Sequence, residues 1–211
     1  MGRKSSLDEQ DVYRVVANEL ATTGRFTVDA LKAATGLSMG SIYHRFESRE
    51  GLLAEAWLNA VEHFQERFIA ALAAGTLDAG LKAALVTPRF CRSNPDEAKL
   101  LACCRQAEFV GEATPAALRA RISVVNDTVS AAVRRFAGAI DRPIVACRLA
   151  LIAYPLGAVR LYLPKSAVPR QLDREIVKAA RAALARQEGR TDRENRLLPR
   201  CADPLASPRS T

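Results

Sequence analysis

The sequence predicts an all-α protein with an N-terminal helix-turn-helix unit and a larger C-terminal helical domain. Hydrophobic residues make up 49% of the 211 residues, but alanine dominates them and aromatic residues account for only 6%. Apolar residues recur at spacings of three and four along most of the chain, which is the period of amphipathic helices. Sustained alternation of β-branched residues and Asn-Gly or Asp-Gly hairpin signals are absent from the sequence.

The first predicted helix begins at a capping box. Ser6 to Glu9 has the required pattern, with acidic residues in the first turn, and the helix is expected to run to about Thr23 and stop at Gly24. An apolar stripe marks its buried side, formed by Val12, Val16 and Leu20 with Tyr13 and Ala17 beside them. This helix would cover the apolar faces of the next two.

Residues 27–46 have the pattern of two short helices joined by a tight turn. Thr27 and Ser38 are residues of the N-cap type, and Gly36 stands where a helix C-terminus needs positive φ. Ile42 and Phe46, four residues apart, give the second helix one apolar face. This arrangement predicts a helix-turn-helix, whose second helix can enter the DNA major groove.

The second helix has the residues that a DNA-reading helix needs. Small residues form its first turn, which lets the backbone approach base edges, and groups that can reach phosphates follow. Ser41 and Tyr43 are expected at or near the bases, whereas Met39 could touch a thymine methyl group or pack into the core with Ile42. The predicted DNA contacts are Thr27, Ser38, Met39, Gly40, Ser41, Tyr43, His44, Arg45 and Arg49.

These motif residues resemble the TetR/AcrR family of transcriptional regulators. The resemblance is carried by Gly36-Leu37-Ser38, by residues 40–44, by Phe46 and by residues 49–52. Arg45 and Arg49 replace a histidine and a lysine that are usual in the family, and both keep hydrogen-bond donors for phosphate. The resemblance implies a ligand-responsive regulator, most often a repressor, that dimerises through its last two long helices.

The rest of the chain reads as further helices with recognisable stops. Apolar periodicity predicts a long helix over residues 49–75, which links the two parts of the protein. Proline, asparagine and glycine positions delimit the others, predicted at 77–91, 96–110, 115–137, 144–163 and 169–187. Pro143 and Asp141 are expected to start the fourth of these, over residues 144–163, and Tyr154-Pro155 to kink it. We predict domains at 1–51 and 52–189, followed by a disordered tail at 190–211.

A ligand cavity in the larger domain would be lined by inward-facing residues of its middle helices. The candidates are Phe90, Cys104, Arg105, Phe109, Val125, Arg148, Leu151, Tyr154, Arg160 and Leu161. Each apolar candidate could equally be ordinary core. The arginines would need a partner if buried, and either an anionic ligand or a nearby carboxylate could supply one.

Composition and charge bear on which classes of function the sequence favours. The net charge is +8, yet residues 1–51 carry seven basic and seven acidic residues, so total charge is weak support for DNA binding. Five cysteines without metal-ligand spacing, only two histidines and no glycine-rich phosphate loop argue against an enzyme, a metal site or a cofactor. The cysteines are read as buried, inert thiols, with a thiol sensor as the alternative.

The sequence as a whole predicts a cytoplasmic, homodimeric, ligand-responsive transcriptional regulator. Its expected partners are a palindromic double-stranded DNA operator and a small-molecule effector whose identity cannot be read from the residues, and no membrane is expected. The alternative is a helical ligand- or partner-binding protein that has lost specific DNA reading.

Overall fold

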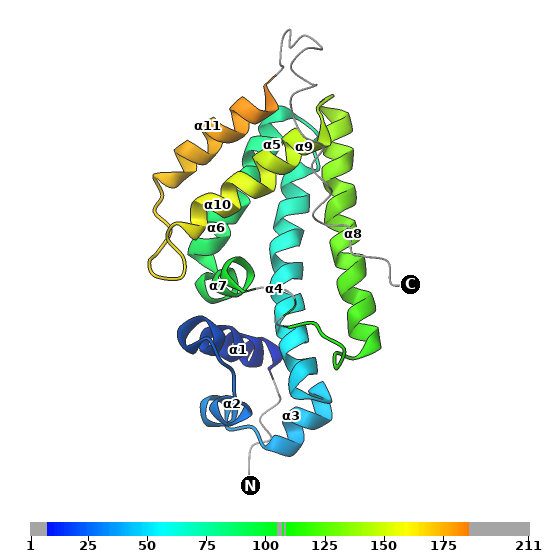
Figure 1. The fold of residues 1–211 in the computed structure, drawn as a ribbon, viewed down its shortest axis with the longest axis vertical. Coiled ribbons are helices and arrows are strands. Elements are labelled where there is room, and N and C mark those ends of the chain that lie inside the picture. Colours follow the sequence, from blue (N-terminus) through cyan, green and yellow to red (C-terminus); the bar gives the residue numbers. More distant parts are fainter. Residues whose placement is uncertain (1–7, 105–106, 108, 186–211) are drawn as a thin grey trace.

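The computed structural model describes residues 8–104, 107 and 109–185. Within these residues all regular structure is helical, which confirms the predicted all-α class. The helices α1 (Glu9–Thr23), α2 (Val28–Thr35) and α3 (Met39–Phe46) form one end of the molecule, and the remaining helices extend away from them (Figure 1). The predicted tail at 190–211 lies outside the described residues.

The three N-terminal helices start and stop close to where the sequence predicts. Asp8 caps α1 by accepting a hydrogen bond from the Gln10 N–H, so the cap lies two residues after the predicted Ser6, which is outside the described residues. Gly24 and Gly36 both have φ of 70°, a left-handed conformation that ends α1 and α2 and that glycine adopts without strain.

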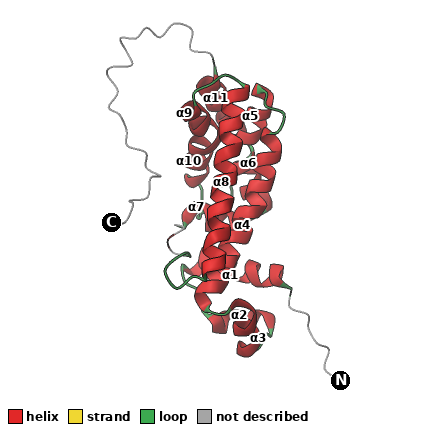
Figure 2. Ribbon diagram, turned by 90° about the vertical axis from the view of Figure 1, so that its right-hand side faces the viewer, coloured by secondary structure: helices red, strands yellow, loops and turns green. Residues whose placement is uncertain are grey.

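The helix α4 (Arg49–Leu72) is the spine of the protein. It starts beside α3 and runs along the long axis to α5 (Figure 1, Figure 2). One hydrophobic cluster joins its first half to the N-terminal helices, and the same cluster takes in Leu100 of α7 together with Leu118 and Ile122 of α8. The N-terminal unit is therefore packed against the helices beyond it as well as being attached through α4.

The middle of the chain folds into more pieces than predicted. The expected helix at 77–91 is two helices, α5 (Leu77–Ala84) and α6 (Val86–Ser93), because Pro88 has no N–H to donate to Ala84. The next helix, α7 (Pro95–Cys103), ends at Cys104 rather than at residue 110. The long α8 (Ala116–Ala139) follows and continues through Gly138, where the sequence suggested a stop.

The predicted kink before Pro155 takes the form of a π-helical turn. The segment consists of α9 (Ile144–Arg148), the π-helix η2 (Leu149–Ala153) and α10 (Tyr154–Arg160). Tyr154 donates its N–H to the Leu149 carbonyl, five residues back, and the wider turn accommodates the proline that follows. Asp141 does not cap α9 as predicted, since it has φ of 53° and the N-cap position is Pro143.

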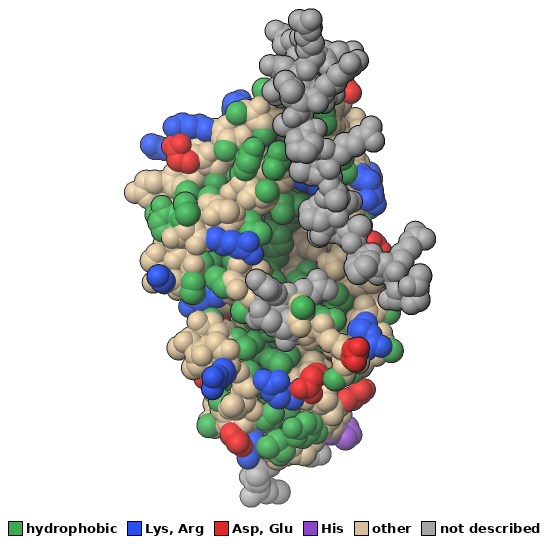
Figure 3. All heavy atoms as spheres, viewed as in Figure 1, with side chains coloured by type: hydrophobic (Ala, Val, Ile, Leu, Met, Phe, Trp, Pro, Cys, Tyr) green, Lys and Arg blue, Asp and Glu red, His purple; other side chains and the backbone are tan. Residues whose placement is uncertain are grey.

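The α9–η2 segment exposes apolar side chains, whereas the last helix exposes mainly charged ones. Val145, Leu149 and Ile152 form an exposed apolar row along α9 and η2, and hydrophobic side chains are visible on this face in Figure 3. The last helix, α11 (Leu172–Leu184), begins three residues later than predicted. Its buried stripe contains Ile176, Ala180 and Leu184, and its exposed positions include Arg174, Glu175, Lys178 and Arg181.

Candidate nucleic-acid interface and ligand cavity

The helix α3 presents one buried face and one exposed face. Ile42 and Phe46 are 1% and 2% exposed and pack into the N-terminal core, where the Phe46 ring meets Tyr13 of α1 edge-on at 6.1 Å. All nine predicted DNA contacts occupy exposed positions. Met39 and Tyr43 are among the large apolar side chains that remain exposed, so Met39 does not pack into the core.

Two of the predicted contact residues are also helix N-caps. The Ser38 hydroxyl accepts the Ser41 N–H at 3.1 Å and lies 2.9 Å from the Ser41 hydroxyl. Thr27 caps α2 by accepting the Ala30 N–H at 3.2 Å. The caps fix where each helix begins, and they leave the amino ends of α2 and α3 exposed, where backbone dipoles favour phosphate.

Arg45 and Arg49 already have partners within the protein. The Arg45 guanidinium donates to Glu9 of α1, lies 3.7 Å from a Glu55 oxygen of α4 and sits over the Phe46 ring. Arg49 donates to the Phe26 carbonyl at 3.0 Å. Their phosphate contacts stay predictions, and the arrangement favours a second task for both, which is to hold α3 and α4 against α1 and the loop before α2.

The contacts around Arg45 shift the pKa values of Glu9 and Tyr13. The hydrogen bond from Arg45 lowers the pKa of the Glu9 carboxyl, more than partial burial raises it. Tyr13 donates its hydroxyl to Glu55 at 2.8 Å, and burial followed by this hydrogen bond raises the pKa of Tyr13. Tyr13 therefore stays neutral at physiological pH and acts as a donor between α1 and α4.

The Glu9 carboxylate should make the N-terminal unit sensitive to acid. Because its pKa is lowered in the folded state, its contribution is complete above the unfolded value of about 4.3 and is lost as the pH falls through the folded value. Glu9 is 40% exposed, so Glu9→Gln should lower stability by at most about 0.5 kcal/mol at neutral pH. Melting curves at several pH values should show this difference shrinking below about pH 4; a difference that persists in strong acid would contradict the ion-pair explanation.

The junction between α3 and α4 is unusually close. Ser48 caps α4 by accepting the Gly51 N–H at 2.9 Å. A Cβ atom at Gly51 would lie 2.3 Å from the Phe46 carbonyl oxygen, a backbone atom that cannot move aside without moving α3. The absence of a side chain at this position therefore sets how α3 sits on the first turn of α4.

Comparison with known protein families agrees with this geometry. Residues 23–56, from the end of α1 into α4, match the family described as bacterial regulatory proteins, tetR family. The chain carries a TetR-family DNA-binding domain. This match supports a DNA-binding transcriptional regulator of the TetR family, as the motif residues predicted. No curated protein matches the chain.

Beyond the residues that match this family, the protein contains an apolar cavity of about 350 Å³. Residues of α4, α6, α7, α8, η2 and α10 line it. Three of the predicted ligand residues are among them: Phe90, Cys104 and Leu151. Five of the lining residues that were not predicted come from α4, namely Trp57, Val61, Phe64, Gln65 and Phe68, because an apolar stripe looks the same whether it meets a packed core or an open space.

Other predicted ligand residues lie elsewhere. Phe109 is buried in the hydrophobic cluster of the N-terminal unit. Tyr154 and Leu161 are 41% and 81% exposed, because the π-turn rotates the residues after it away from the position that a regular helix would give them. Arg148 is half-buried outside the cavity lining, and Arg105 lies outside the described residues.

Two further candidates also have other surroundings. Val125 packs against the N-terminal cluster rather than lining this cavity. Arg160 donates to the Ala102 carbonyl at 2.7 Å, at the C-terminal end of α7, where a cation and a donor are both favourable. The structure thus gives Arg160 a backbone carbonyl as its partner, which is neither of the two partners considered from the sequence.

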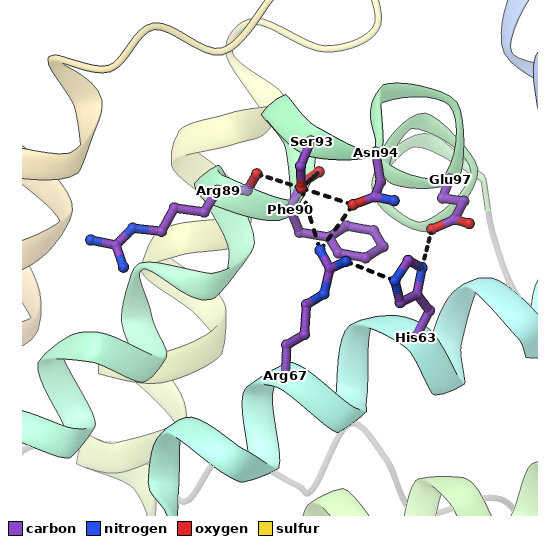
Figure 4. Close-up of polar contacts among 7 residues, drawn as sticks. All are labelled: His63, Arg67, Arg89, Phe90, Ser93, Asn94 and Glu97. Carbon is purple, nitrogen blue, oxygen red and sulfur yellow. Dashed lines mark hydrogen bonds and ion pairs between the residues drawn. The ribbon is translucent and has the colours of Figure 1, made fainter.

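A group of polar contacts fastens α4 to α6 and α7 next to the cavity (Figure 4). Arg67 of α4 donates to the Asn94 side chain at 2.9 Å and lies 2.8 Å from His63 Nε2, with its guanidinium over the Phe90 ring. A guanidinium only donates, so His63 Nε2 accepts and His63 Nδ1 carries the hydrogen given to Glu97 at 2.9 Å. Phe90 also lines the cavity, so this clasp connects the cavity wall to α4.

Removing the clasp should loosen α6 and α7. Arg67→Met keeps an apolar stem over Phe90 but loses the bonds to His63 and Asn94, and we expect a loss of about 1 kcal/mol in the free energy of unfolding. Hydrogen exchange should become faster in residues 86–103. Arg121→Met is the matched control, since Arg121 makes one exposed pair with Glu62, and equal effects of both changes would remove the special role of the clasp.

Among the described cysteines, Cys91 and Cys147 are buried as expected, whereas Cys103 is exposed. Burial raises the pKa of Cys91 to about 11 and also raises the pKa of Cys103 and Cys147, so these thiols are protonated at neutral pH. Over the described ranges, no group of three or more histidine, cysteine, aspartate or glutamate side chains is arranged to hold a metal ion. A search of the same ranges finds no helix long and apolar enough to cross a membrane.

Proposed function

We propose that this TetR-family regulator is a homodimeric repressor that leaves a palindromic operator when a small molecule fills the cavity. In this proposal residues 1–51 bind DNA, residues 52–189 bind the effector and the second copy, and residues 190–211 are a tail. The protein would act in the cytoplasm, where the operator is found. It needs no cofactor and catalyses no reaction.

The observation that carries the proposal is the continuity of α4. Its first turn is in close contact with the end of α3 at Gly51 and Phe46, and its middle lines the cavity through Trp57, Phe64 and Gln65. A ligand that alters the position of α4 would therefore move the DNA-reading helix. By linkage, operator affinity would fall by the same coupling free energy with which DNA weakens ligand binding.

The exposed face of α3 supports a role in the major groove. Ser41, Tyr43 and Met39 are available for base edges, and Thr27, Ser38 and His44 for the phosphates on either side. Arg45 and Arg49 would join the phosphate contacts only by sharing their guanidinium groups with Glu9 and the Phe26 carbonyl, respectively.

An exposed apolar row supports dimerisation. Val145, Leu149 and Ile152 follow one another along α9 and η2 and remain open to solvent in a single chain. A two-fold axis beside this row would pair it with its own copy and would place two α3 helices against successive major grooves, about 34–36 Å apart.

Selection of DNA from a random pool by the purified protein tests the proposal. Recovery of a two-fold symmetric site would support a dimeric DNA reader, and a reporter under control of that site would show whether binding lowers transcription. An asymmetric half-site would contradict the dimer, and raised transcription would contradict the repressor.

The competing function is a helical ligand- or partner-binding protein without specific DNA reading. It is favoured by the equal numbers of basic and acidic residues in 1–51 and by the internal partners of Arg45 and Arg49. Absence of any enriched sequence at any salt concentration would support this alternative over the proposed regulator.

A further inference from the structure

Three polar side chains line the cavity without a partner of their own. They are Gln65 of α4, Thr87 of α6 and Asn126 of α8, and the first two are only 9% and 8% exposed. Within the described part of the chain none of the three makes a side-chain hydrogen bond. No fully enclosed polar side-chain atom in that part lacks a partner, so the unpaired atoms of Gln65 and Thr87 keep some accessible surface, and both residues line the cavity.

Such an arrangement is costly unless the cavity has an occupant. Because these groups have no partner in the described protein, they must bond to water or to a bound molecule in the cavity; without either they would lose their bonds to water and gain nothing in return. The three groups come from three different helices that line one cavity, and together they offer both donors and acceptors there. Functional sites are where proteins tolerate this kind of local instability.

The charge around the cavity restricts what can enter it. Among the described residues, none of those lining the cavity is lysine, arginine, histidine, aspartate or glutamate. The nearby charged groups already have partners in the clasp: Arg67 bonds to Asn94 and His63, and Glu97 bonds to His63. Against these described lining residues, a carboxylate or an ammonium group would lose its hydration without gaining a counter-charge.

We infer that the cavity takes an uncharged, largely apolar molecule whose polar end carries both a hydrogen-bond donor and an acceptor. The apolar body packs against Trp57, Phe68 and Leu151, and the polar end bonds to Gln65, Thr87 and Asn126. A volume of about 350 Å³ suits a compact ligand, at the lower end of the usual range. Naming this molecule as the effector rests on the proposed function, whereas the binding site itself does not.

Three compounds with one carbon chain and different polar ends test this inference. Octanamide is neutral and both donates and accepts, octanoate is an anion, and octylammonium is a cation. Trp57 is the sole tryptophan of the chain and lines the cavity, so its fluorescence reports on occupancy. We expect octanamide to bind at least tenfold more tightly than either ion; equal or tighter binding of an ion, or no binding of octanamide, would overturn the inference.

Variants of the polar residues separate a binding role from a structural one. Gln65→Met and Thr87→Val keep size and remove the unpaired groups, so each should weaken octanamide binding about tenfold while the unliganded protein melts at the same or a higher temperature. Thr128→Val is the matched control, because Thr128 is exposed on α8 and bonds to the Val124 carbonyl. Unchanged octanamide affinity, or a lower melting temperature for both variants, would show that the polar groups serve the fold.

The fluorescence assay contains no DNA, so its outcome is independent of the regulatory proposal. Operator binding with and without octanamide is measured separately. Tight octanamide binding that leaves operator affinity unchanged would contradict the regulatory role and uphold the binding site. Release of DNA by an ion but not by octanamide would uphold the regulatory role and overturn the inferred ligand class.

Discussion

Replacing Tyr43 with alanine is expected to lower operator affinity about a hundredfold and to leave the melting temperature unchanged. Tyr43 is 41% exposed on α3, and no hydrogen bond joins it to the rest of the described structure. Loss of one side chain at a base edge costs about 1.4 kcal/mol or more, which is tenfold. A dimer on a palindrome suffers this loss twice.

Two further variants distinguish a loss of base contacts from a loss of stability. Tyr43→Phe removes only the hydroxyl, so comparison with Tyr43→Ala divides the effect between hydrogen bonding and ring contact. Leu77→Ala is the control, since Leu77 is equally exposed at the far end of the molecule. Tyrosine is uncharged, so the salt dependence of binding should keep its slope. An equal loss of affinity for operator and for random DNA would refute the role in base reading.

Replacing Gly51 with alanine is expected to lower the free energy of unfolding by about 1–3 kcal/mol and to abolish specific DNA binding. Alanine normally stabilises a helix relative to glycine by about 0.5–1 kcal/mol, so the expected sign is the reverse of the usual one. The cause is the 2.3 Å approach of the new Cβ to the Phe46 carbonyl oxygen, which forces α3 away from α4.

Gly40→Ala provides the matched control for this change. Gly40 lies on the exposed face of α3, and a methyl group there would come no closer than 3.9 Å to the Ser38 hydroxyl oxygen. The fold should therefore gain up to about 1 kcal/mol, while operator affinity falls because the methyl group stands between the helix backbone and the bases. Denaturant unfolding and DNA binding of both variants check this contrast, and equal stability changes in the two would contradict it.

The exposed face of α3 could be predicted because it depends on residues close together in the sequence. The caps at Thr27 and Ser38, the left-handed Gly36 and the four-residue spacing of Ile42 and Phe46 are all local, and each appears in the structure as expected. The break at Pro88 is local as well, and the missing N–H was a sufficient signal that the sequence interpretation overlooked.

The sequence by itself determined the helical class, the helix-turn-helix and the side of α3 that faces outward, because helix period and capping act within a few residues. Only the tertiary structure decided that Arg45 meets Glu9 and Glu55, and that Gln65 opens onto a cavity rather than pairing inside the protein. These outcomes depend on where separate helices come together. The pattern of residues along one helix does not specify which side chain of another helix, or which cavity, will lie next to it.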